Sequence, residues 1–374
     1  MQIKKSHLNY EINNVIHKVI YSNNTTKLLK SDIQKIKNSP KILFIYDKNI
    51  NSKIIKDFKK ILNSLKNEHY SVAVVGGKHN KDTSLLFKII NKLSSENFTK
   101  NSIIISIGGG VVGDVASFAS AIYMRGLYYF HIPSTMTSIL DSCIGGKTAI
   151  NYDNKINLLG TYYHPYRVYL SHEILKDIPV REYQSGFAEA IKCGIIDDKK
   201  ILELLDSKFK DIMDRKFFIL KIIFLRVLKS KIKFFLKDVR EKRQRLFLNF
   251  GHTFAHAIEM AGSLNNKYQI NHGEAVALGV ICEMKYANTN KKFIDYILYM
   301  LNKYKLIKKV NLKKIQKEKF YKKVFENLFL DKKRISKYPR YIKINNDLDP
   351  SIDELRDFNK TKEIIKSTII TING

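Results

Sequence analysis

The chain has 374 residues, of which 44% are hydrophobic and 11% aromatic, which supplies a folded interior and excludes a disordered chain. The formal net charge is +31, but lysines occur in nearly every segment and no nucleic-acid-binding signature is present, so specific nucleic-acid binding is not expected. Cys143, Cys193 and Cys282 lie far apart without a CxxC pair, which excludes a disulfide framework and fits a reducing cytoplasm.

The first half of the chain predicts alternating strands and helices. Short apolar runs predict buried strands at residues 42–46, 71–75, 103–107 and 130–133. Apolar residues at helical spacing predict helices at 54–65 and 83–93, between the first three of these strands. Strands joined by helices are typical of β-α-β units, so we expect an α/β, Rossmann-like parallel-sheet domain over residues 1–170.

The second half of the chain predicts mainly helices. From about residue 171 the helical pattern dominates, at 186–196, 217–236, 252–261 and 274–288. Residues 342–344 fit one short strand, and the Lys-rich part after residue 302 contains no chemical motif. We therefore expect a second, mainly α-helical domain over residues 171–374. The polar N-terminus and the absence of a membrane-length apolar stretch predict neither secretion nor membrane insertion.

A glycine-rich run follows the strand predicted at 103–107. It reads GGGVVGD at residues 108–114 and matches GxGxxG at a strand-to-helix turn, where bare backbone N–H groups can bind a pyrophosphate. A tight turn without a ligand is the alternative, because no acidic residue follows about twenty positions later to bind a ribose. Asp47, at the end of the strand predicted at 42–46, is a candidate ribose acceptor instead.

A second polar cluster spans residues 133–148. It combines the hydroxyl groups of Ser134 and Thr135 with Asp141, two glycines and Lys147. Charged groups beside hydroxyls and exposed backbone can hold a hydroxylated, phosphorylated ligand. A glycine-rich turn with incidental charges explains the same residues equally well.

The most informative pattern lies in residues 245–259. Its polar residues are spaced four, three, four and three positions apart, which predicts one helical face that carries Arg245, Asn249, His252, His256 and Glu259. Two histidines at i and i+4 can share a metal, although a single histidine is more often an ordinary core residue.

Two further residues extend this pattern. Glu189 lies inside the apolar helical run GFAEAIK, and a buried carboxylate needs a partner. His272 stands at a predicted helix start, in the run NHGE. One carboxylate and two imidazoles form a catalytic zinc set that leaves a coordination position open to substrate.

Six motifs, taken together and in this order, resemble those of the 3-dehydroquinate synthases. They read GGGVVGD at 108–114, MRG at 124–126, DSCIGGKT at 141–148, GFAEAIK at 186–192, LNFGHTFAHAIE at 248–259 and HGEAVA at 272–277. The resemblance runs from about Asp47 to Lys333, and its histidine motifs are the most specific part. It implies a cytoplasmic homodimer whose active site lies in the cleft between the two domains.

The resemblance also implies the residues of each site. Zinc, with cobalt as a substitute, would be held by Glu189, His252 and His272. NAD would lie on Asp47, Lys81, Gly109, Gly110, Val111, Asp114, Ser134, Thr135, Asp141 and Lys147. The anionic sugar-phosphate substrate would contact Arg125, Asn157, Lys192, Lys231, Arg245, Asn249, His256 and one or both of Lys332 and Lys333. The groups expected to act in catalysis are His256, Lys147, Lys192, Lys231, Arg245 and Asn249.

The activity implied by the resemblance is the conversion of 3-deoxy-D-arabino-heptulosonate 7-phosphate to 3-dehydroquinate and phosphate, in the shikimate pathway. Transient oxidation by NAD allows phosphate to be eliminated, after which the hydride returns and an intramolecular aldol step closes the ring. Other sugar-phosphate cyclases and metal-dependent polyol or alcohol dehydrogenases of related fold are the alternative enzymes. A basic nucleic-acid-binding protein is the alternative from another class.

Three positions depart from the family pattern, of which Ser134, in PST for Pro-Thr-Thr, keeps a hydroxyl and should be nearly harmless. Residues 77–81 read GKHNK, so Lys78 replaces the carboxylate expected to bind ribose, and NAD is predicted to bind weakly. Residues 155–157 read KIN in place of Gly-Lys-Asn, so Ile156 occupies the place of a ligand-binding lysine.

Overall fold

The chain divides into two compact units, which we describe separately. Unit 1 comprises Met1–Tyr183 and Lys210–Ile232, and unit 2 comprises Gln184–Phe209 and Lys233–Gly374. The structure is a computed structural model, and it describes residues 7–77, 80–153, 155–263, 270–307, 314–329, 337–345 and 349–371.

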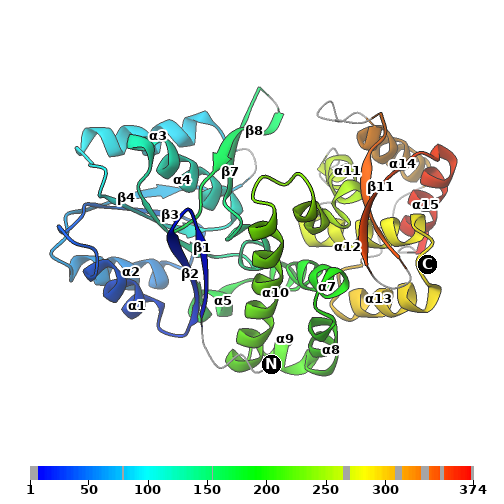
Figure 1. Cartoon of the computed structure of the whole chain (residues 1–374), viewed down its shortest axis with the longest axis horizontal. Helices are drawn as coiled ribbons and strands as arrows, with labels where there is room; N and C mark the ends of the chain where they lie inside the picture. Colours follow the sequence, from blue (N-terminus) through cyan, green and yellow to red (C-terminus); the bar gives the residue numbers. More distant parts are fainter. Residues whose placement is uncertain are drawn as a thin grey trace. The chain divides into compact units, whose positions relative to one another are not determined.

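Unit 1 is built on a seven-stranded sheet in the order β1-β2-β9-β6-β5-β3-β4 (Figure 1). The strands are β1 His7–Ile12, β2 Val15–Ser22, β3 Ile42–Asp47, β4 His69–Val74, β5 Ile103–Gly108, β6 Tyr128–Pro133 and β9 Arg167–Ser171. Only the β1–β2 pair is antiparallel among these neighbours. The mostly parallel sheet confirms the predicted α/β class of this unit, and each of its four predicted strands is present.

Helices cover both faces of this sheet because alternate residues of each strand point to opposite sides. Leu43 and Ile45 belong to one apolar cluster, together with residues of α3 and α4. Ile42 and Phe44 belong to the other, together with residues of α1 and α2. The helices of unit 1 are α1 Thr25–Gln34, α2 Ser52–Asn63, α3 Thr83–Ser95, α4 Gly110–Ile122, α5 His172–Asp177, α9 Phe209–Met213 and most of α10 Phe217–Lys237. Because all strands of this sheet except β1 run parallel, their carboxyl ends lie at the same edge of the sheet, where binding loops usually lie.

A second, two-stranded sheet follows the glycine pair at 145–146. It consists of β7 Lys147–Tyr152 and the fully exposed β8 Lys155–Tyr162, which pair antiparallel with an irregularity between Ile150 and Tyr152. A glycine-rich, loop-like segment is expected at 133–148, but residues 138–142 form a π-helix, and Lys147 and Thr148 begin β7. They continue into a strand because β7 packs on α4 and buries Ile150.

Unit 2 is mainly helical, as predicted. Its elements are α7 Phe187–Ile196, α8 Lys199–Ser207, η4 Gln244–Asn249, α11 His252–Ser263, α12 His272–Tyr286, α13 Lys291–Lys303, α14 Lys314–Phe329, α15 Phe358–Thr371 and a hairpin of β10 Arg340–Ile344 with β11 Pro350–Glu354. The strand predicted at 342–344 is β10. The short helix α6 Val180–Ser185 spans the end of the first segment of unit 1.

The predicted continuous helical face at residues 245–259 is wrong. Arg245 and Asn249 lie on the 3-10 helix η4, whereas His252, His256 and Glu259 lie on α11. The helix breaks because Gly251 has a positive φ of 81°, and a Cβ there would lie 2.7 Å from the Val280 side chain of α12. η4 and α11 are therefore separate helices, and their side chains do not lie on one continuous helical face.

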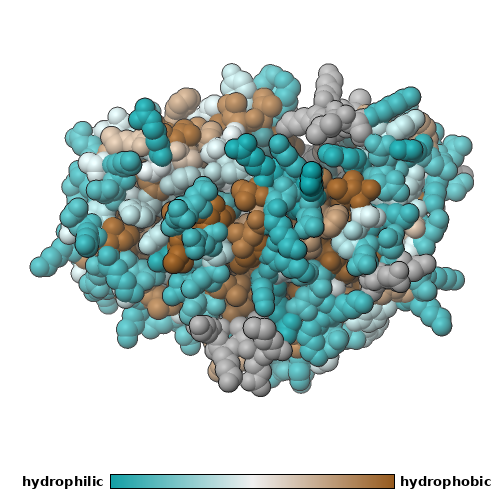
Figure 2. All heavy atoms as spheres, in the orientation of Figure 1, coloured by the Kyte–Doolittle hydropathy of each residue, from teal (hydrophilic) through white to brown (hydrophobic). Residues whose placement is uncertain are grey.

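The surface agrees with the strongly basic composition. On the face seen in Figure 2, hydrophilic residues cover most of the surface, and hydrophobic residues show mainly between them. None of the described helices is long and apolar enough to cross a membrane.

Candidate active site

The glycine run of unit 1 forms the expected strand-to-helix turn between β5 and α4. Gly108 ends β5, and a Cβ at this position would lie 2.4 Å from Val112, so a side chain does not fit. Gly109 caps α4 and Gly110 is its first residue. The N–H groups of the first turn, which includes Val111, therefore have no intrahelical acceptors and can bind an anion.

The loop after β6 lies against this turn. The Ser134 N–H donates to the Gly108 carbonyl at 2.9 Å, and the Thr135 hydroxyl oxygen accepts from the Ser138 N–H at 3.2 Å. A Cβ added to Gly109 would lie 3.0 Å from the Thr135 methyl group. The structure thus brings together the glycine run and the two hydroxyl residues that were predicted to bind one cofactor.

Asp47 stands at the end of β3, as predicted. Its carboxylate accepts from the Asn49 N–H at 3.0 Å and lies so close to Gly76 that a Cβ there would be 2.3 Å from Oδ2. Asp47 therefore offers an acceptor beside the glycine turn that follows β4. Lys78, the departure noted in this turn, lies outside the described residues.

Three predicted ligand-binding residues of unit 1 meet at Lys81. Its ammonium group forms an ion pair with Asp114 and donates a hydrogen bond of 2.5 Å to Asn157 Oδ1. Burial raises the pKa of Asp114, and the Lys81 charge opposes this shift. The contact joins two residues expected to bind NAD with one expected to bind substrate. Ile156, next to Asn157, is 59% exposed and lies outside this cluster.

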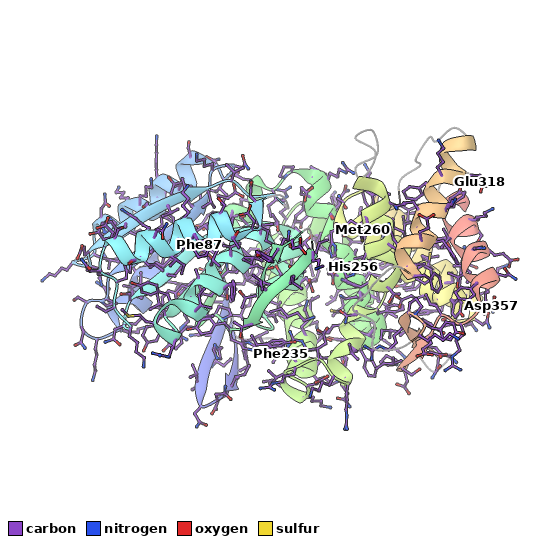
Figure 3. All side chains as sticks on the ribbon, turned by 90° about the horizontal axis from the view of Figure 1, so that it is seen from above. Phe87, Phe235, His256, Met260, Glu318 and Asp357 are labelled. Carbon is purple, nitrogen blue, oxygen red and sulfur yellow. The ribbon has the colours of Figure 1, made fainter. Side chains whose placement is uncertain are left out.

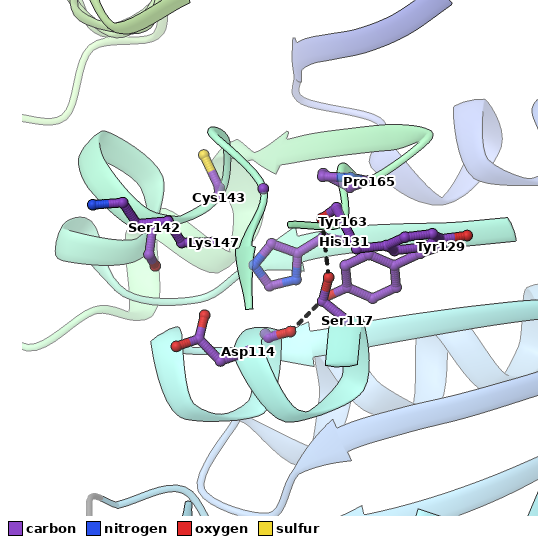
Figure 4. Close-up of a pocket in the computed structure, with 11 residues that line it drawn as sticks. Asp114, Ser117, Tyr129, His131, Ser142, Cys143, Lys147, Tyr163 and Pro165 are labelled. Carbon is purple, nitrogen blue, oxygen red and sulfur yellow. Dashed lines mark hydrogen bonds between the residues drawn. The ribbon is translucent and has the colours of Figure 1, made fainter. Parts of the chain in front are cut away.

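A second ion pair of unit 1 joins Lys231 of α10 to Asp141 in η3, the π-helix Ser138–Ser142. Lys147 begins β7 and lines a small cavity that opens to solvent. Asp114, His131 and Tyr163 also line this cavity (Figure 4). Two residues predicted to bind NAD, Asp114 and Lys147, thus line one small cavity in unit 1.

Arg125 lies on a strained turn. It and Met124 adopt positive φ angles of 65° and 48°, which side chains other than glycine rarely adopt. Two such residues in a row store backbone strain, and strain of this kind concentrates at functional sites. The geometry is consistent with the binding role predicted for Arg125.

In unit 2, three elements bring Glu189, His252 and His272 together. Glu189 lies in α7, while each histidine is the first residue of its helix, α11 or α12. Glu189 Oε1 lies 3.5 Å from His252 Nε2 and 3.3 Å from His272 Nε2. The three ligand atoms lie within 4.8 Å of one another, so one ion can reach all of them.

The groups behind the two imidazoles fit a metal at this point. His252 Nδ1 lies 3.2 Å from the Phe250 carbonyl, and His272 Nδ1 lies 3.5 Å from Glu259 Oε2. Acceptors at Nδ1 hold a proton there, so Nε2 is the atom of each ring that can bind a cation, which on His272 would take the place of the Nε2 proton. One carboxylate and two imidazoles are a donor set typical of catalytic zinc.

Burial and neighbouring charges set the pKa values of these three residues. Burial lowers the pKa of His252 to about 3, assisted by the nearby Lys192 charge. Burial also disfavours charge on His272, but its hydrogen bonds with Glu189 and Glu259 raise its pKa to about 10. Burial alone would raise the pKa of Glu189, yet Lys192 and the two histidines hold it well below its usual value. The site therefore keeps an anionic carboxylate and a neutral His252.

The remaining predicted residues of unit 2 include two buried cations. Lys192 is almost completely buried and pairs with Glu189 Oε2. Arg245 is also buried, and its Nη1 donates to the Val239 carbonyl at 2.8 Å. His256 is exposed one turn after His252 (Figure 3).

Two acidic residues that sequence reasoning missed organise the loop before η4. Asp238 accepts from the N–H groups of three residues, at 2.9 Å from Lys242, 2.6 Å from Arg243 and 3.2 Å from Arg245. Glu241 accepts from the Asn249 amide at 2.9 Å. Lys332 and Lys333, the last predicted substrate contacts, lie outside the described residues.

The chain is similar in sequence to 3-dehydroquinate synthases. Residues 71–185 match the family model described as 3-dehydroquinate synthase N-terminal, and residues 186–334 match the model described as 3-dehydroquinate synthase C-terminal. The 3-dehydroquinate synthase of Clostridium tetani is 36% identical over 299 residues, which cover 79% of this chain and 78% of that protein. That of Thermodesulfovibrio yellowstonii is 36% identical over 265 residues, which cover 69% and 70%.

Solved structures share the fold over almost the whole chain. A 2-deoxy-scyllo-inosose synthase complexed with carbaglucose-6-phosphate, NAD+ and Co2+ has a TM-score of 0.83 at 23% identity, covering 96% of this chain and 99% of that one. A 2-epi-5-epi-valiolone synthase from Streptomyces hygroscopicus with NAD+ and Zn2+ bound has a TM-score of 0.80 at 17% identity, with 97% and 98% covered. An iron-containing alcohol dehydrogenase from Thermotoga maritima reaches 0.64 at 14% identity, with 94% and 97% covered. At these low identities the likeness shows the fold alone.

Proposed function

Because the chain belongs to the 3-dehydroquinate synthase family, we propose that it converts 3-deoxy-D-arabino-heptulosonate 7-phosphate to 3-dehydroquinate and phosphate. The observation that carries the proposal is the convergence of Glu189, His252 and His272 on one point beside the buried Lys192. A buried carboxylate, two imidazoles with converging Nε2 atoms and a buried cation suit a metal-assisted reaction of an anionic substrate.

The proposed cofactors are zinc, for which cobalt can substitute, and NAD. When bound, the metal polarises a secondary alcohol of the substrate, and NAD takes up its hydride and later returns it. Glu189, His252 and His272 would hold the metal. NAD would bind at the glycine turn of unit 1, with Asp47, Lys81, Asp114, Ser134, Thr135, Asp141 and Lys147 around it.

The cationic residues bind and orient the negative groups of the substrate. Arg245 offers a planar fork that suits a carboxylate or phosphate, and Lys192 offers a point charge. Both are buried, so water screens their charges less than it screens those of the many surface lysines. Arg125, Asn157, Lys231, Asn249 and the lysines at 332 and 333 complete the proposed substrate contacts.

Oxidation of the alcohol acidifies the neighbouring C–H of the substrate, whose proton then leaves, with the substrate phosphate as one available base. Electrons of that C–H bond expel phosphate, and Arg and Lys groups stabilise the charge on the leaving oxygen. The exposed His256 imidazole can hold or relay a proton at its Nε2 or Nδ1 atom. Ring opening and an intramolecular aldol step then need only orientation of the bound molecule.

The assembly and location of the enzyme belong to the same proposal. A homodimer is expected from the family resemblance, and the β7–β8 hairpin offers an apolar surface for it. Ile156, Leu158 and Tyr162 of β8 are 59%, 38% and 40% exposed, although apolar side chains are normally covered. The three free, buried cysteines are consistent with the cytoplasm.

A substrate panel tests the proposed activity. Purified protein with Zn2+ and NAD is given the heptulosonate phosphate, glucose 6-phosphate or glycerol, and phosphate, 3-dehydroquinate and NADH are measured. The proposal expects phosphate and 3-dehydroquinate from the first compound only. Phosphate release from glucose 6-phosphate alone would indicate another sugar-phosphate cyclase. Accumulating NADH with glycerol would indicate a dehydrogenase.

A further inference from the structure

Two buried rings of β6 lie against the start of α4. Tyr129 and His131 stand two positions apart, so they point to the same side of the strand, and their ring centroids are 5.9 Å apart (Figure 4). A Cβ added to Gly113 of α4 would lie 3.0 Å from His131 Cε1 and 3.1 Å from Nε2. The last glycine of the GxGxxG run therefore makes room for the imidazole.

The neighbouring strand supplies a hydrogen-bond partner for both rings. Ser106 is the polar residue of the otherwise apolar strand β5, and it pairs with His131 in the register of the sheet. Its hydroxyl oxygen lies 2.8 Å from His131 Nδ1 and 2.8 Å from Tyr129 Oη. The Tyr129 hydroxyl in turn donates to the Gly113 carbonyl at 3.0 Å. Four buried groups from β5, β6 and α4 thus form one hydrogen-bonded chain.

The number of protons fixes the direction of this chain. A carbonyl has no proton to give, so the single Tyr129 proton lies between Tyr129 and Gly113. Ser106 must then donate to Tyr129, and it has no second proton for His131. The contact between Ser106 and His131 therefore requires a proton on Nδ1. Burial lowers the pKa of His131 to about 3, so the ring is neutral and its Nε2 atom is an acceptor.

The Nε2 side of the ring faces the π-helix η3. It lies 3.5 Å from Ser138 Oγ, which accepts from the Ser142 hydroxyl at 3.3 Å, so this side makes the weaker contacts. A Cβ added to Gly110, the first residue of α4, would lie 3.4 Å from Ser142 Oγ. Because η3 also carries Asp141, one imidazole connects the sheet, the helix of the glycine turn and the segment of Asp141.

We propose that His131 is a positioning residue of the cofactor site: as its Nδ1–H tautomer it joins β5 and β6 to α4 and η3, and so holds the glycine turn and Asp141 in place for NAD. The inference rests on the proposed function, because it assumes that NAD binds at this turn. His131 acts through these neighbours and not by contact with the cofactor. Without its nitrogens, the buried Ser106 hydroxyl loses a donor, which is costly in a site closed to water.

The tautomer can be measured on the protein without any ligand. The protein is labelled with 15N-histidine, and long-range proton–nitrogen NMR spectra are recorded at about pH 8 and about pH 6, on either side of the usual histidine pKa. The chain has 10 histidines, and the signal lost in His131→Asn identifies the ring in question. We expect a proton on Nδ1 and none on Nε2 at both pH values. A proton on Nε2 at either pH overturns the proposal.

Three variants separate positioning from general packing. His131→Phe keeps a ring but removes both nitrogens, whereas His131→Asn keeps an amide near the place of Nδ1, within reach of Ser106. His172→Phe is the matched control, because His172 is also buried in unit 1 and its Nδ1 lies 2.5 Å from Tyr21 Oη. The readouts are the Kd for NAD by calorimetry and the urea midpoint of unfolding.

His131→Phe should weaken NAD binding by roughly five- to a hundredfold, the equivalent of one buried hydrogen bond left unmade. His131→Asn should restore the Kd to within about threefold of the wild type, and His172→Phe should lower the urea midpoint with a Kd inside the same range. Wild-type NAD affinity in His131→Phe overturns the proposal. Equal weakening in His172→Phe also overturns it, because lost stability would then explain the effect. If His131→Phe does not fold, unchanged NAD affinity in Ser106→Ala overturns the proposal.

The proposed function fails by a different result. If the wild type binds no NAD, the cofactor assignment itself is wrong and the role of His131 falls with it. If the wild type binds NAD and His131→Phe binds it equally well, the cofactor assignment stands and His131 is a packing residue.

Discussion

Two histidines one turn apart on α11 differ in their burial. His252 is buried and directed toward Glu189, whereas His256 is exposed. The sequence leaves open whether the pair shares one metal, because the i, i+4 spacing allows it. Burial and the position of His272 favour a metal role for His252 and a substrate role for His256.

Substituting each histidine separately tests this division. His252→Ala should raise the Kd for Zn2+ by more than about a hundredfold and abolish turnover, because a ligand is lost. His256→Ala should bind Zn2+ normally but turn over slowly. Metal titration by calorimetry and a phosphate-release assay give both quantities, and circular dichroism checks the fold. Normal turnover in His252→Ala would count against the assignment.

Lys78 stands where the family resemblance implies a ribose-binding carboxylate. A cation at the ribose position removes a charge-assisted hydrogen bond worth about 1.5–3 kcal/mol, which corresponds to roughly ten- to a hundredfold in affinity. Lys78→Glu should therefore tighten NAD binding by about that factor. Calorimetry with NAD and NADP measures it, and Lys56→Glu on α2 controls for the change in overall charge. Unchanged NAD affinity would place Lys78 outside the ribose pocket.

Among the secondary-structure elements, the buried strands and the glycine turn could be predicted because their apolar runs and glycines act locally. The break at Gly251 could not, since its cause is contact with Val280 of α12, far away in sequence. The β7–β8 hairpin was missed because β8 is exposed throughout, so its apolar residues do not mark a buried strand. Asp238 and Glu241 form loop contacts that no spacing rule reports.

Strand β6 makes a pH dependence testable in unit 1. Burial lowers the pKa of His131 to about 3, despite its hydrogen bond with Ser106. Its usual value is about 6.5, so the neutral ring contributes stability above about pH 6.5, and this contribution is lost as the pH falls toward 3. The wild type should therefore lose more unfolding free energy than His131→Gln between about pH 7 and pH 4. Urea unfolding measures both, with His69→Gln as control; equal losses would contradict the assignment.

At the scale of the whole molecule, each of the two units is made of two separate segments of the chain. Residues 210–232 belong to unit 1 although they follow part of unit 2 in the sequence, and they include Lys231, the partner of Asp141. Sequence patterns cannot show which unit this segment belongs to, because it is helical like its neighbours. The domain boundary expected near residue 170 stays a prediction, and so does the cleft.

Metal binding should stabilise the folded protein as a whole. An ion that binds only the folded state at a hundred times its Kd adds about 2.7 kcal/mol, which for a chain of this length is about 3–4 °C in Tm. Removing metal with a chelator should lower Tm by this amount, and Zn2+ should restore it in the wild type but not in His252→Ala. Differential scanning calorimetry measures the shift. An identical response in the variant would mean that the ion binds elsewhere.

The most direct test of the central claim counts turnovers per NAD. Enzyme with Zn2+ receives the heptulosonate phosphate in large excess over NAD, and phosphate, 3-dehydroquinate and NADH are followed together. A cyclase that returns its hydride must release one phosphate for each 3-dehydroquinate, many times per NAD, with no lasting NADH. Phosphate release that stops when it equals the NAD supplied, with NADH accumulating, or no phosphate release at all, would contradict the account.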